Sequence, residues 1–268
     1  MGSELGGARE DRRQRLKELL SRAEATRPAP LSYEQERLWF LEQLAPGTSR
    51  YNVPVALRVR GMLDPDALDR ALRAVIRRHA ALRTVFPAAK GVPVQLVRPT
   101  AEVRIERRDL SAEPDPQDWA RGAVAEEAGR PFPLDRGPLL RALLLRLGDV
   151  DHVLLLTLHH IVCDGGSLAI LLHDLHVHYA AGGTASEDAL PRMALQYADY
   201  AVRQRARLRG EALDRELAYW RSRLDGIPAS LDLPFDRPRP AAGPPDGGFL
   251  ATRLRGPLVD QLRALAAG

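Results

Sequence analysis

The chain has 268 residues and a formal net charge of +4; 45% of its residues are hydrophobic and 28% are charged. This composition is typical of a globular protein with a buried core and differs from that of disordered chains. Basic residues are interspersed with acidic ones and aromatic residues make up only 5%. The sequence therefore does not predict a nucleic-acid partner, which would require positive charge gathered on one face.

No apolar run reaches the roughly 20 residues that a membrane-spanning helix needs. Residues 1–15 lack the apolar centre of a secretory signal. We therefore expect a cytoplasmic protein with no membrane partner. Cys163 is the only cysteine, which excludes an internal disulfide and a cysteine-based metal cluster.

The N-terminal third predicts two helices and a strand. Residues 1–30 are expected to form a leader helix or linker, because residues 8–25 carry a narrow apolar stripe on an otherwise charged helix. A second helix is predicted to begin after Ser32, since Gln35 three positions later completes a capping box. Alternating apolar residues then predict a strand over residues 51–61.

The middle of the chain begins with its clearest helical pattern. Asp64 is suited to be the N-cap and Pro65 the first helical residue, and apolar residues recur with helical spacing as far as Ile76. Apolar alternation predicts strands within residues 92–98 and 102–110.

Further elements follow in alternation. Residues 113–129 around Trp119 predict a helix, and residues 138–160 predict two strands joined at a Gly-Asp turn. A long helical region is expected over residues 192–224. Helices mixed with consecutive strands favour an α/β sandwich with a mixed sheet. The glycine-rich phosphate-binding motifs and the G-x-S-x-G motif of serine hydrolases are missing from the sequence.

The stretch LLLTLHHIVCDGGSLAILLHDL places two histidines and an aspartate where a predicted strand gives way to a predicted helix. Alternation along a strand puts His159 and His160 on opposite faces, so only one of them would face a cleft. Ser167 is expected to cap the following helix. Gly165 and Gly166 would permit a tight turn and a close approach of another group to the backbone.

Composition and spacing leave three interpretations of these residues open. The first is a core histidine beside a turn, with a structural role alone. The second is a general acid or base, namely a histidine with a reference pKa of about 6.5 that is held by Asp164. The third, disfavoured because neighbouring strand residues point apart, is a metal site. Its candidate ligands are His159, His160, Asp164, His173, His176 and His178.

Five motifs in order resemble those of the condensation domains of nonribosomal peptide synthetases, which belong to the chloramphenicol acetyltransferase-like superfamily. The segment HHIVCDG, residues 159–165, matches the His-His-x-x-x-Asp-Gly signature of that family. Residues 31–54 resemble the opening motif of the family, and residues 78–86 resemble its second motif. Residues 197–202 resemble the fourth motif, and residues 219–240 resemble the segment that follows it.

The resemblance implies two similar lobes with the active site between them. Residues 31–205 would form the N-terminal lobe, a chloramphenicol acetyltransferase-like α/β sandwich with a mixed sheet. Residues 206–268 would form the start of a second, similar lobe, which would be truncated here.

The function implied by the resemblance is amide bond formation. A carrier-bound aminoacyl or peptidyl thioester would be the donor and the α-amine of a carrier-bound acceptor would be the nucleophile. Upstream and downstream peptidyl carrier proteins and adjacent synthetase modules would be the partners. The chain itself would bind no cofactor, because the substrates arrive on the 4'-phosphopantetheine arms of the carriers. The alternatives are an ester-forming acyltransferase of the same superfamily and a non-catalytic half-domain that docks carriers.

The resemblance also assigns roles to single residues. His160 would be the catalytic base or would orient the attacking amine, and His159 would be structural. Asp164 would hold the loop through an arginine, with Arg83 of the second motif as a local candidate. Gly165 would keep the substrate tunnel clear.

The sequence departs from the family pattern at two positions within these motifs. Ala80 stands where glutamate is usual, and Gly166 stands where tryptophan is frequent. Cys163, inside the signature, is expected to be a small buried residue and not a nucleophile.

Overall fold

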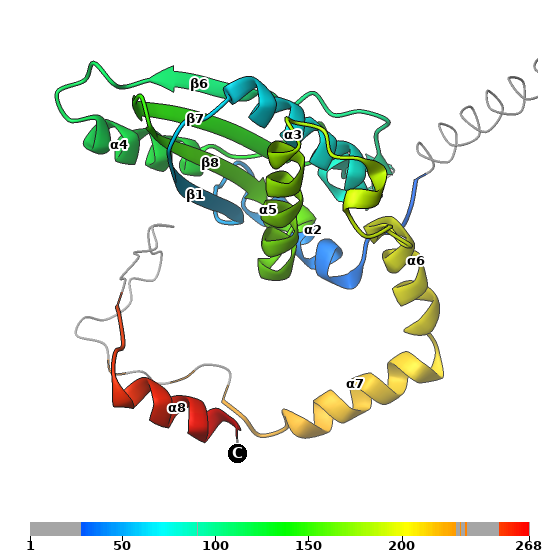
Figure 1. The fold of residues 1–268 in the computed structure, drawn as a ribbon. Helices are drawn as coiled ribbons and strands as arrows, with labels where there is room; N and C mark the ends of the chain where they lie inside the picture. Colours follow the sequence, from blue (N-terminus) through cyan, green and yellow to red (C-terminus); the bar gives the residue numbers. More distant parts are fainter. Residues whose placement is uncertain (1–27, 90, 229–230, 232–233, 235–251, 268) are drawn as a thin grey trace, which may run out of the picture. The chain divides into compact units, whose positions relative to one another are not determined.

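A computed structural model of the chain describes residues 28–89, 91–228, 231, 234 and 252–267. The chain divides into two compact units, one ending at Leu224 and the other beginning at Asp225. The first unit contains the sheet and the helices that cover it (Figure 1). Within the second unit the structure describes the helix α8, Pro257–Ala267. The predicted leader helix lies outside the described residues.

The first unit is built on a four-stranded sheet with the order β1-β8-β7-β6. The strands are β1 (Asn52–Arg60), β6 (Ile105–Asp109), β7 (Leu140–Gly148) and β8 (Asp151–His159). β8 runs antiparallel to both β1 and β7, whereas β6 and β7 are parallel. The predicted mixed sheet is therefore confirmed.

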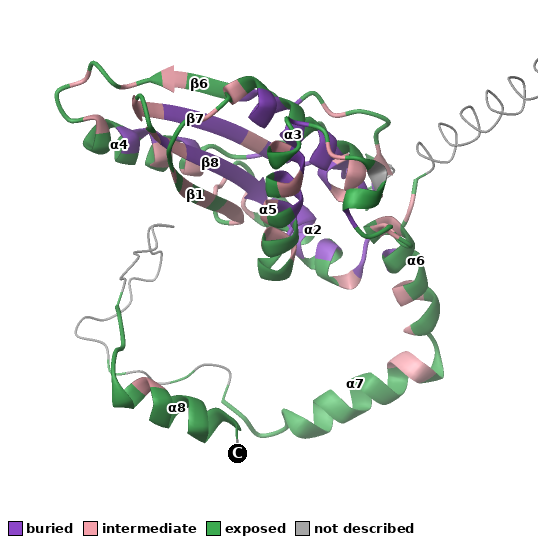
Figure 2. Ribbon diagram, viewed as in Figure 1, coloured by how far each residue is buried: buried purple, intermediate pink, exposed green. Residues whose placement is uncertain are grey.

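Helices cover both faces of this sheet. α3 (Pro65–Arg78) and α5 (Gly165–Ala180) lie on one face, and α4 (Pro116–Gly129) lies on the other. Because both faces are covered, β7 and β8 are buried along most of their length (Figure 2). This double burial explains why their sequences are continuous apolar runs instead of alternating patterns.

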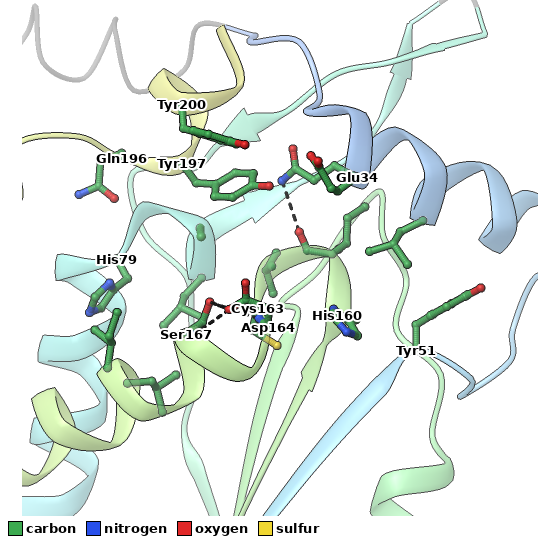
Figure 3. A pocket seen from close by; sticks show the side chains of 18 of the residues that line it. Glu34, Tyr51, His79, His160, Cys163, Asp164, Ser167, Gln196, Tyr197 and Tyr200 are labelled. Carbon is green, nitrogen blue, oxygen red and sulfur yellow. Dashed lines mark hydrogen bonds between the residues drawn. The ribbon is translucent and has the colours of Figure 1, made fainter. Parts of the chain in front are cut away.

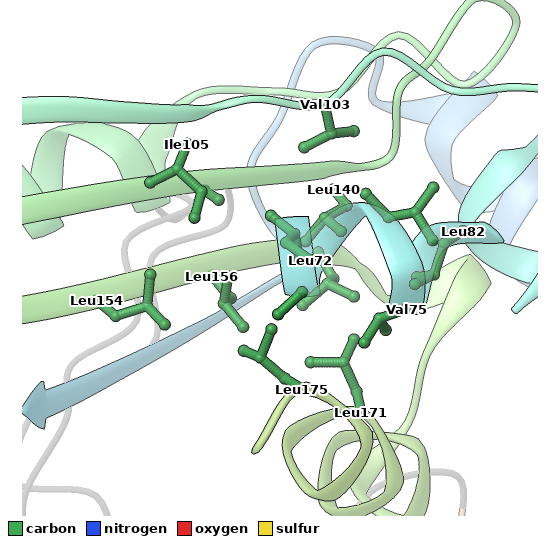
Figure 4. Close-up of a cluster of buried hydrophobic side chains, with 14 of the residues drawn as sticks. Leu72, Val75, Leu82, Val103, Ile105, Leu140, Leu154, Leu156, Leu171 and Leu175 are labelled. Carbon is green, nitrogen blue, oxygen red and sulfur yellow. The ribbon is translucent and has the colours of Figure 1, made fainter. Parts of the chain in front are cut away.

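The largest core cluster lies between the sheet and the pair α3 and α5 (Figure 4). Alternate side chains of β8 point into it, whereas Leu155 points to α4 on the opposite face. The labelled members of this cluster are Leu72, Val75, Leu82, Val103, Ile105, Leu140, Leu154, Leu156, Leu171 and Leu175. The cluster fixes α5, and therefore its first turn, against the end of β8.

A second cluster packs α2 (Tyr33–Leu44) against the turn that follows β8. Leu38 of α2 contacts a group that includes Phe86, Phe132 and Ile161. The remaining elements are η1 (Ala80–Arg83), β2 (Thr84–Val85), β3 (Ala88–Ala89), β4 (Val92–Pro93), β5 (Leu96–Val97), η2 (His160–Val162), η3 (Glu187–Ala189), α6 (Tyr197–Arg207) and α7 (Glu211–Arg223).

The two predicted N-terminal helix caps, Ser32 and Asp64, are confirmed. The Ser32 hydroxyl accepts a hydrogen bond from the Gln35 backbone N–H, and the Gln35 side chain accepts one from the Ser32 backbone N–H. Oδ1 of Asp64 accepts hydrogen bonds from two backbone N–H groups in the first turn of α3. Both caps depend on residues no more than three positions apart, which is why the sequence reveals them.

The long helical region predicted over residues 192–224 is helical along most of its length, but it starts later than expected and is interrupted. Residues 192–196 lie outside any helix, and the rest is divided into α6 and α7. Gly210 has a φ of 55° and precedes α7, so the backbone leaves the right-handed helical region at that point. The expected domain boundary between residues 205 and 206 falls inside α6 and stays a prediction, as does a second lobe.

The strand predicted over residues 92–98 is also shorter than expected, because only β4 and β5, two residues each, form there. Across the described ranges, no helix combines the length and the apolar character that crossing a lipid bilayer would require.

Candidate functional site

The two histidines of the signature lie at the point where the chain leaves the sheet. His159 is the last residue of β8 and pairs with Asn52 of β1. His160 begins the short turn η2, and its backbone N–H donates to the Tyr51 carbonyl. The His159 side chain is 2% exposed, whereas His160 is exposed. The prediction that the two histidines face opposite ways is confirmed.

The His159 imidazole is a buried, neutral group. Its Nδ1 accepts a hydrogen bond from the Ile161 backbone N–H at 3.1 Å, so Nε2 carries the proton. The ring lies against the rings of Tyr51 and Phe132. Burial, together with the nearby His160, lowers the pKa of His159 to about 4. His159 therefore shapes the turn and stays uncharged at neutral pH.

The metal-site interpretation finds no matching geometry. His178, on the buried side of α5, accepts a hydrogen bond at Nδ1 from the Ala185 backbone N–H. Over the described ranges, no three histidine, cysteine, aspartate or glutamate side chains converge as metal ligands would.

Asp164 is the N-cap of α5, a position that the sequence pattern assigned to Ser167. Oδ1 of Asp164 accepts hydrogen bonds from the Ser167 backbone N–H at 2.8 Å and from its hydroxyl at 2.6 Å. The Ser167 hydroxyl in turn accepts from the Asp164 backbone N–H at 3.2 Å. Ser167 therefore closes a capping box from the third helical position. These hydrogen bonds, assisted by His160, lower the pKa of Asp164.

The expected contact between Asp164 and Arg83 is not formed. The Arg83 guanidinium donates to the backbone carbonyls of Ile76, Arg77, Arg98 and Pro99. The carbonyls at the end of α3 lack helical partners, and a guanidinium with five donors satisfies them well. Arg83 therefore joins η1 to the end of α3 and to residues 98–99, and burial lowers its pKa.

Gly165 occupies the first position of α5, directly after Asp164. A Cβ atom built on it would meet no other atom within 4 Å. The space beside the first turn of α5 is therefore open on this side.

His160 and Asp164 face a cavity of about 610 Å³ (Figure 3). Residues from the start of α2, from η1 and from the start of α6 complete its wall. The lining includes Glu34, Leu38, Tyr51, His79, Leu82, His160, Asp164, Ser167, Ile170, Tyr197 and Tyr200. This volume and the mixture of apolar and polar groups are typical of ligand-binding cavities.

Several hydrogen bonds hold α6 against the start of α2 on one side of the cavity. The Tyr197 hydroxyl lies 3.0 Å from the Ser32 hydroxyl, and burial raises the pKa of Tyr197. The Gln204 side chain accepts from the Tyr33 backbone N–H at 2.9 Å and donates to the Glu34 carboxylate at 3.1 Å. Local sequence patterns assign none of these side chains a role in the site, although all but Gln204 lie in the opening and fourth motifs.

A second histidine lines the same cavity, on the side of α3. Nε2 of His79 lies 2.7 Å from Oδ2 of Asp174, and the same oxygen accepts from Nε of Arg78 at 2.9 Å. Asp174 is 2% exposed. The buried carboxylate therefore holds the end of α3 to α5 behind the cavity wall.

Cys163 is a buried thiol and not an activated nucleophile. Its Sγ lies 3.6 Å from the carbonyl oxygen of His159. Burial, with the neighbouring Asp164 carboxylate, raises the pKa of Cys163 to about 12. Because the thiolate is the reactive form, this side chain is inert at neutral pH, which confirms that it is a small buried residue.

The chain is similar to known proteins along most of its length. A family model described as "Condensation domain" matches residues 25–268. Phosphinothricin tripeptide synthetase PhsC of Streptomyces viridochromogenes is 46% identical over 245 residues, which are 90% of this chain and 22% of that protein. A component of the linear gramicidin synthase of Brevibacillus parabrevis is 42% identical over 240 residues, 88% of this chain and 3% of that protein.

Solved structures of condensation-type domains are also similar to this chain. The X-domain from teicoplanin biosynthesis, in complex with OxyB, is 34% identical with a TM-score of 0.69, over 80% of this chain and 47% of that chain. The first condensation domain of the CDA synthetase is 26% identical with a TM-score of 0.65, over 76% of this chain and 52% of that chain. The chain thus spans about half the length of these structures and a smaller part of its curated relatives. It belongs to the condensation domain family of the nonribosomal peptide synthetases.

Proposed function

We propose that this chain carries the catalytic histidine of a condensation reaction that joins two carrier-bound substrates by an amide bond. The observation that carries the proposal is the placement of His160. Its imidazole lines the 610 Å³ cavity, and no other described residue makes a hydrogen bond to its ring. The neighbouring His159 is buried and neutral. In this proposal His159 has the structural role and His160 has the chemical one.

The reaction needs little from the protein beyond orientation and one proton acceptor. The acceptor amine attacks the carbonyl carbon of the donor thioester, an N–C bond forms, the C–S bond breaks, and the donor carrier keeps its arm as a thiol. The proton lost by the amine moves to His160, which delivers it to the leaving sulfur. Holding two tethered substrates together accounts for about 7 kcal/mol or more of rate acceleration, and the imidazole contributes general base catalysis.

The other residues of the signature support this geometry. Asp164 caps α5 and thereby fixes the turn that presents His160. Gly165 leaves the space beside that turn open. His159 and Arg83 are positioning residues, since His159 accepts from a backbone N–H of the turn η2 and Arg83 donates to carbonyls at the end of α3 and at residues 98–99. Upstream and downstream carrier proteins and adjacent synthetase modules are the proposed partners, and they supply the 4'-phosphopantetheine arms.

A single-turnover assay tests the proposal. Donor and acceptor carriers are loaded with aminoacyl groups and mixed with the 268-residue chain. Intact-protein mass spectrometry then follows the donor acyl mass onto the acceptor carrier. We expect transfer by the unmodified chain and none by His160→Ala. Normal transfer by His160→Ala refutes the catalytic role. A hydroxyacyl acceptor that is used in preference to the aminoacyl one favours the ester-forming alternative.

A binding role is the second candidate function. The X-domain that resembles this chain at 34% identity is described in a complex with another protein, OxyB. Carrier binding that His160→Ala leaves unchanged, without acyl transfer by the unmodified chain, favours this candidate over catalysis.

A further inference from the structure

The first unit contains a second cavity, which the proposed reaction does not use. Its volume is about 560 Å³, and it lies between the second half of α2, the loop that follows α2 and residues 131–136. It shares no lining residue with the cavity at His160. A volume of this size is within the range of sites that bind small molecules. The apolar part of its wall includes Trp39, Pro46, Phe86, Pro131, Phe132 and Pro133.

Glu42 lines this second cavity and has an incomplete set of hydrogen bonds. The residue is 7% exposed. Its Oε1 accepts a hydrogen bond from the Gly47 backbone N–H at 3.2 Å, whereas no described residue donates one to the buried Oε2. Burial raises the pKa of Glu42. A buried acceptor without a partner costs free energy, and a charged donor bound beside it would offset that cost best.

The charges around the second cavity leave Glu42 unbalanced. The other charged residues in its wall are Asp135 and Arg136. Nε of Arg136 lies 3.5 Å from Oδ1 of Asp135, so these two charges offset each other. Glu42 has no such partner for its Oε2 among the described residues. The wall therefore has an excess of negative charge, which favours a cation.

Trp39 places an aromatic ring on the same side of α2 as Glu42. The two residues are three positions apart on this helix, and residues at that spacing are neighbours on one face. The indole ring is the best aromatic partner for an organic cation. Phe132, in the same wall, already has the Arg141 guanidinium over its ring, 3.7 Å from the centroid. An acidic group and an aromatic group therefore stand side by side at the cavity.

We propose that the second cavity binds an organic cation, namely an ammonium, amidinium or guanidinium group on an apolar stem, beside Trp39 and Glu42. The cationic group donates to Oε2 of Glu42, and the stem packs against the aromatic and proline side chains. An anion would meet an unpaired carboxylate, and an apolar ligand would leave Oε2 without a donor. The described side chains offer no set of ligands for a metal ion here. The cation comes from a free small molecule or from a basic side chain of a partner protein.

The test compares each cation with a neutral molecule of nearly the same shape. Benzamidinium and benzamide represent a free small molecule. A capped tripeptide with a central arginine, and the same peptide with citrulline instead, represent a partner's side chain. Isothermal titration calorimetry at neutral pH gives the Kd values for the unmodified chain. We expect at least one cation to bind with a Kd of about 1 mM or tighter, and its neutral counterpart to bind about tenfold more weakly. The cation that binds more tightly identifies the source.

Three variants locate the binding site. Glu42→Gln removes the charge and keeps an oxygen that can accept from Gly47, and it should weaken binding of the cation about tenfold. Trp39→Leu should weaken it about threefold or more. Glu126→Gln is the matched control, because Glu126 is an exposed residue of α4 that does not line the second cavity. It should change no Kd value. Circular dichroism checks that each variant is folded.

Nuclear magnetic resonance gives a second measure of location. The chain has three tryptophans, and each has one indole N–H resonance. The signal of Trp39 is identified by its loss in Trp39→Leu. Addition of the cation should shift this signal in the unmodified chain and leave those of Trp119 and Trp220 in place.

The inference is overturned if the unmodified chain binds neither cation, if the neutral counterparts bind equally well, or if folded Glu42→Gln binds the cation as tightly as the unmodified chain. The comparison of charged and neutral probes uses the unmodified chain, so it decides the question even if a variant fails to fold. Cation binding by a chain that transfers no acyl group supports this inference and refutes the proposed catalysis. Acyl transfer that depends on His160, in a chain that binds no cation, has the opposite meaning.

Discussion

The imidazoles of His159 and His160 are consecutive in the chain and lie in opposite environments. His159 ends β8 with its ring buried between Tyr51 and Phe132. His160 begins η2 with its ring at the cavity. His159 is the last residue of the β8 ladder, and successive residues along a strand point to opposite faces, so the side chain of His160 leaves on the other side.

Alanine substitutions of the two histidines should therefore have opposite effects. His159→Ala should lower the free energy of unfolding by about 2–4 kcal/mol, since it empties a buried site. His160→Ala should change it by less than about 0.5 kcal/mol while abolishing acyl transfer. Urea denaturation and the transfer assay measure the two properties. His176→Ala, an exposed position on α5, should alter neither. Equal stability losses for His159→Ala and His160→Ala would contradict the structure.

The stability of the fold should fall on mild acidification because of His159. The pKa of this residue is lowered from 6.5 to about 4, so between these values the unfolded chain binds a proton that the folded chain does not. The contribution is fully present above about pH 6.5 and is lost as the pH falls toward 4, a change of about 3 kcal/mol.

Urea denaturation at pH 7.5 and pH 4.5 measures this effect. Carboxylates titrate in the same range, so the comparison is with His159→Phe, which removes the titrating group. The variant should lose less stability than the unmodified chain between the two pH values. The same loss in both proteins would show that His159 is not the group responsible.

Asp164→Ala should act mainly on folding. The substitution removes the N-cap of α5 and its two hydrogen bonds to Ser167, which costs about 1 kcal/mol of unfolding free energy. Asp164→Asn keeps an oxygen acceptor and should retain most of the stability. Thermal denaturation followed by circular dichroism distinguishes the two variants. An Asp164→Ala protein with full stability but no acyl transfer would assign the carboxylate a direct part in the reaction.

Asp174→Ala should be among the more destabilising single substitutions. The carboxylate is buried and holds both Arg78 and His79, and removing it leaves Arg78, itself largely buried, without its ion partner. A loss of about 3 kcal/mol is expected from urea denaturation. Glu106→Ala, which breaks the exposed pair with Arg108, should cost less than about 1 kcal/mol. Comparable losses in the two variants would show that burial of the Asp174 network contributes little.

The sequence predicted those features that depend on close neighbours. The capping box of Ser32 and Gln35, the Asp64 cap and the divergence of His159 and His160 each involve residues within four positions, and all three are confirmed. The mixed α/β sandwich was also predicted, because apolar periods of two and of 3.6 residues distinguish strands from helices.

The tertiary structure decided which distant residues meet. Tyr197 reaches Ser32 across 165 positions, and Arg83 turns to carbonyls at residues 98 and 99 instead of to Asp164. Nothing in local spacing encodes such contacts, because they depend on how the β8 ladder and the α3–α5 core place distant elements beside one another. The His-His-x-x-x-Asp-Gly signature was readable in the sequence, whereas the cavity around it required long-range packing, since its wall combines segments that are close only in the folded chain.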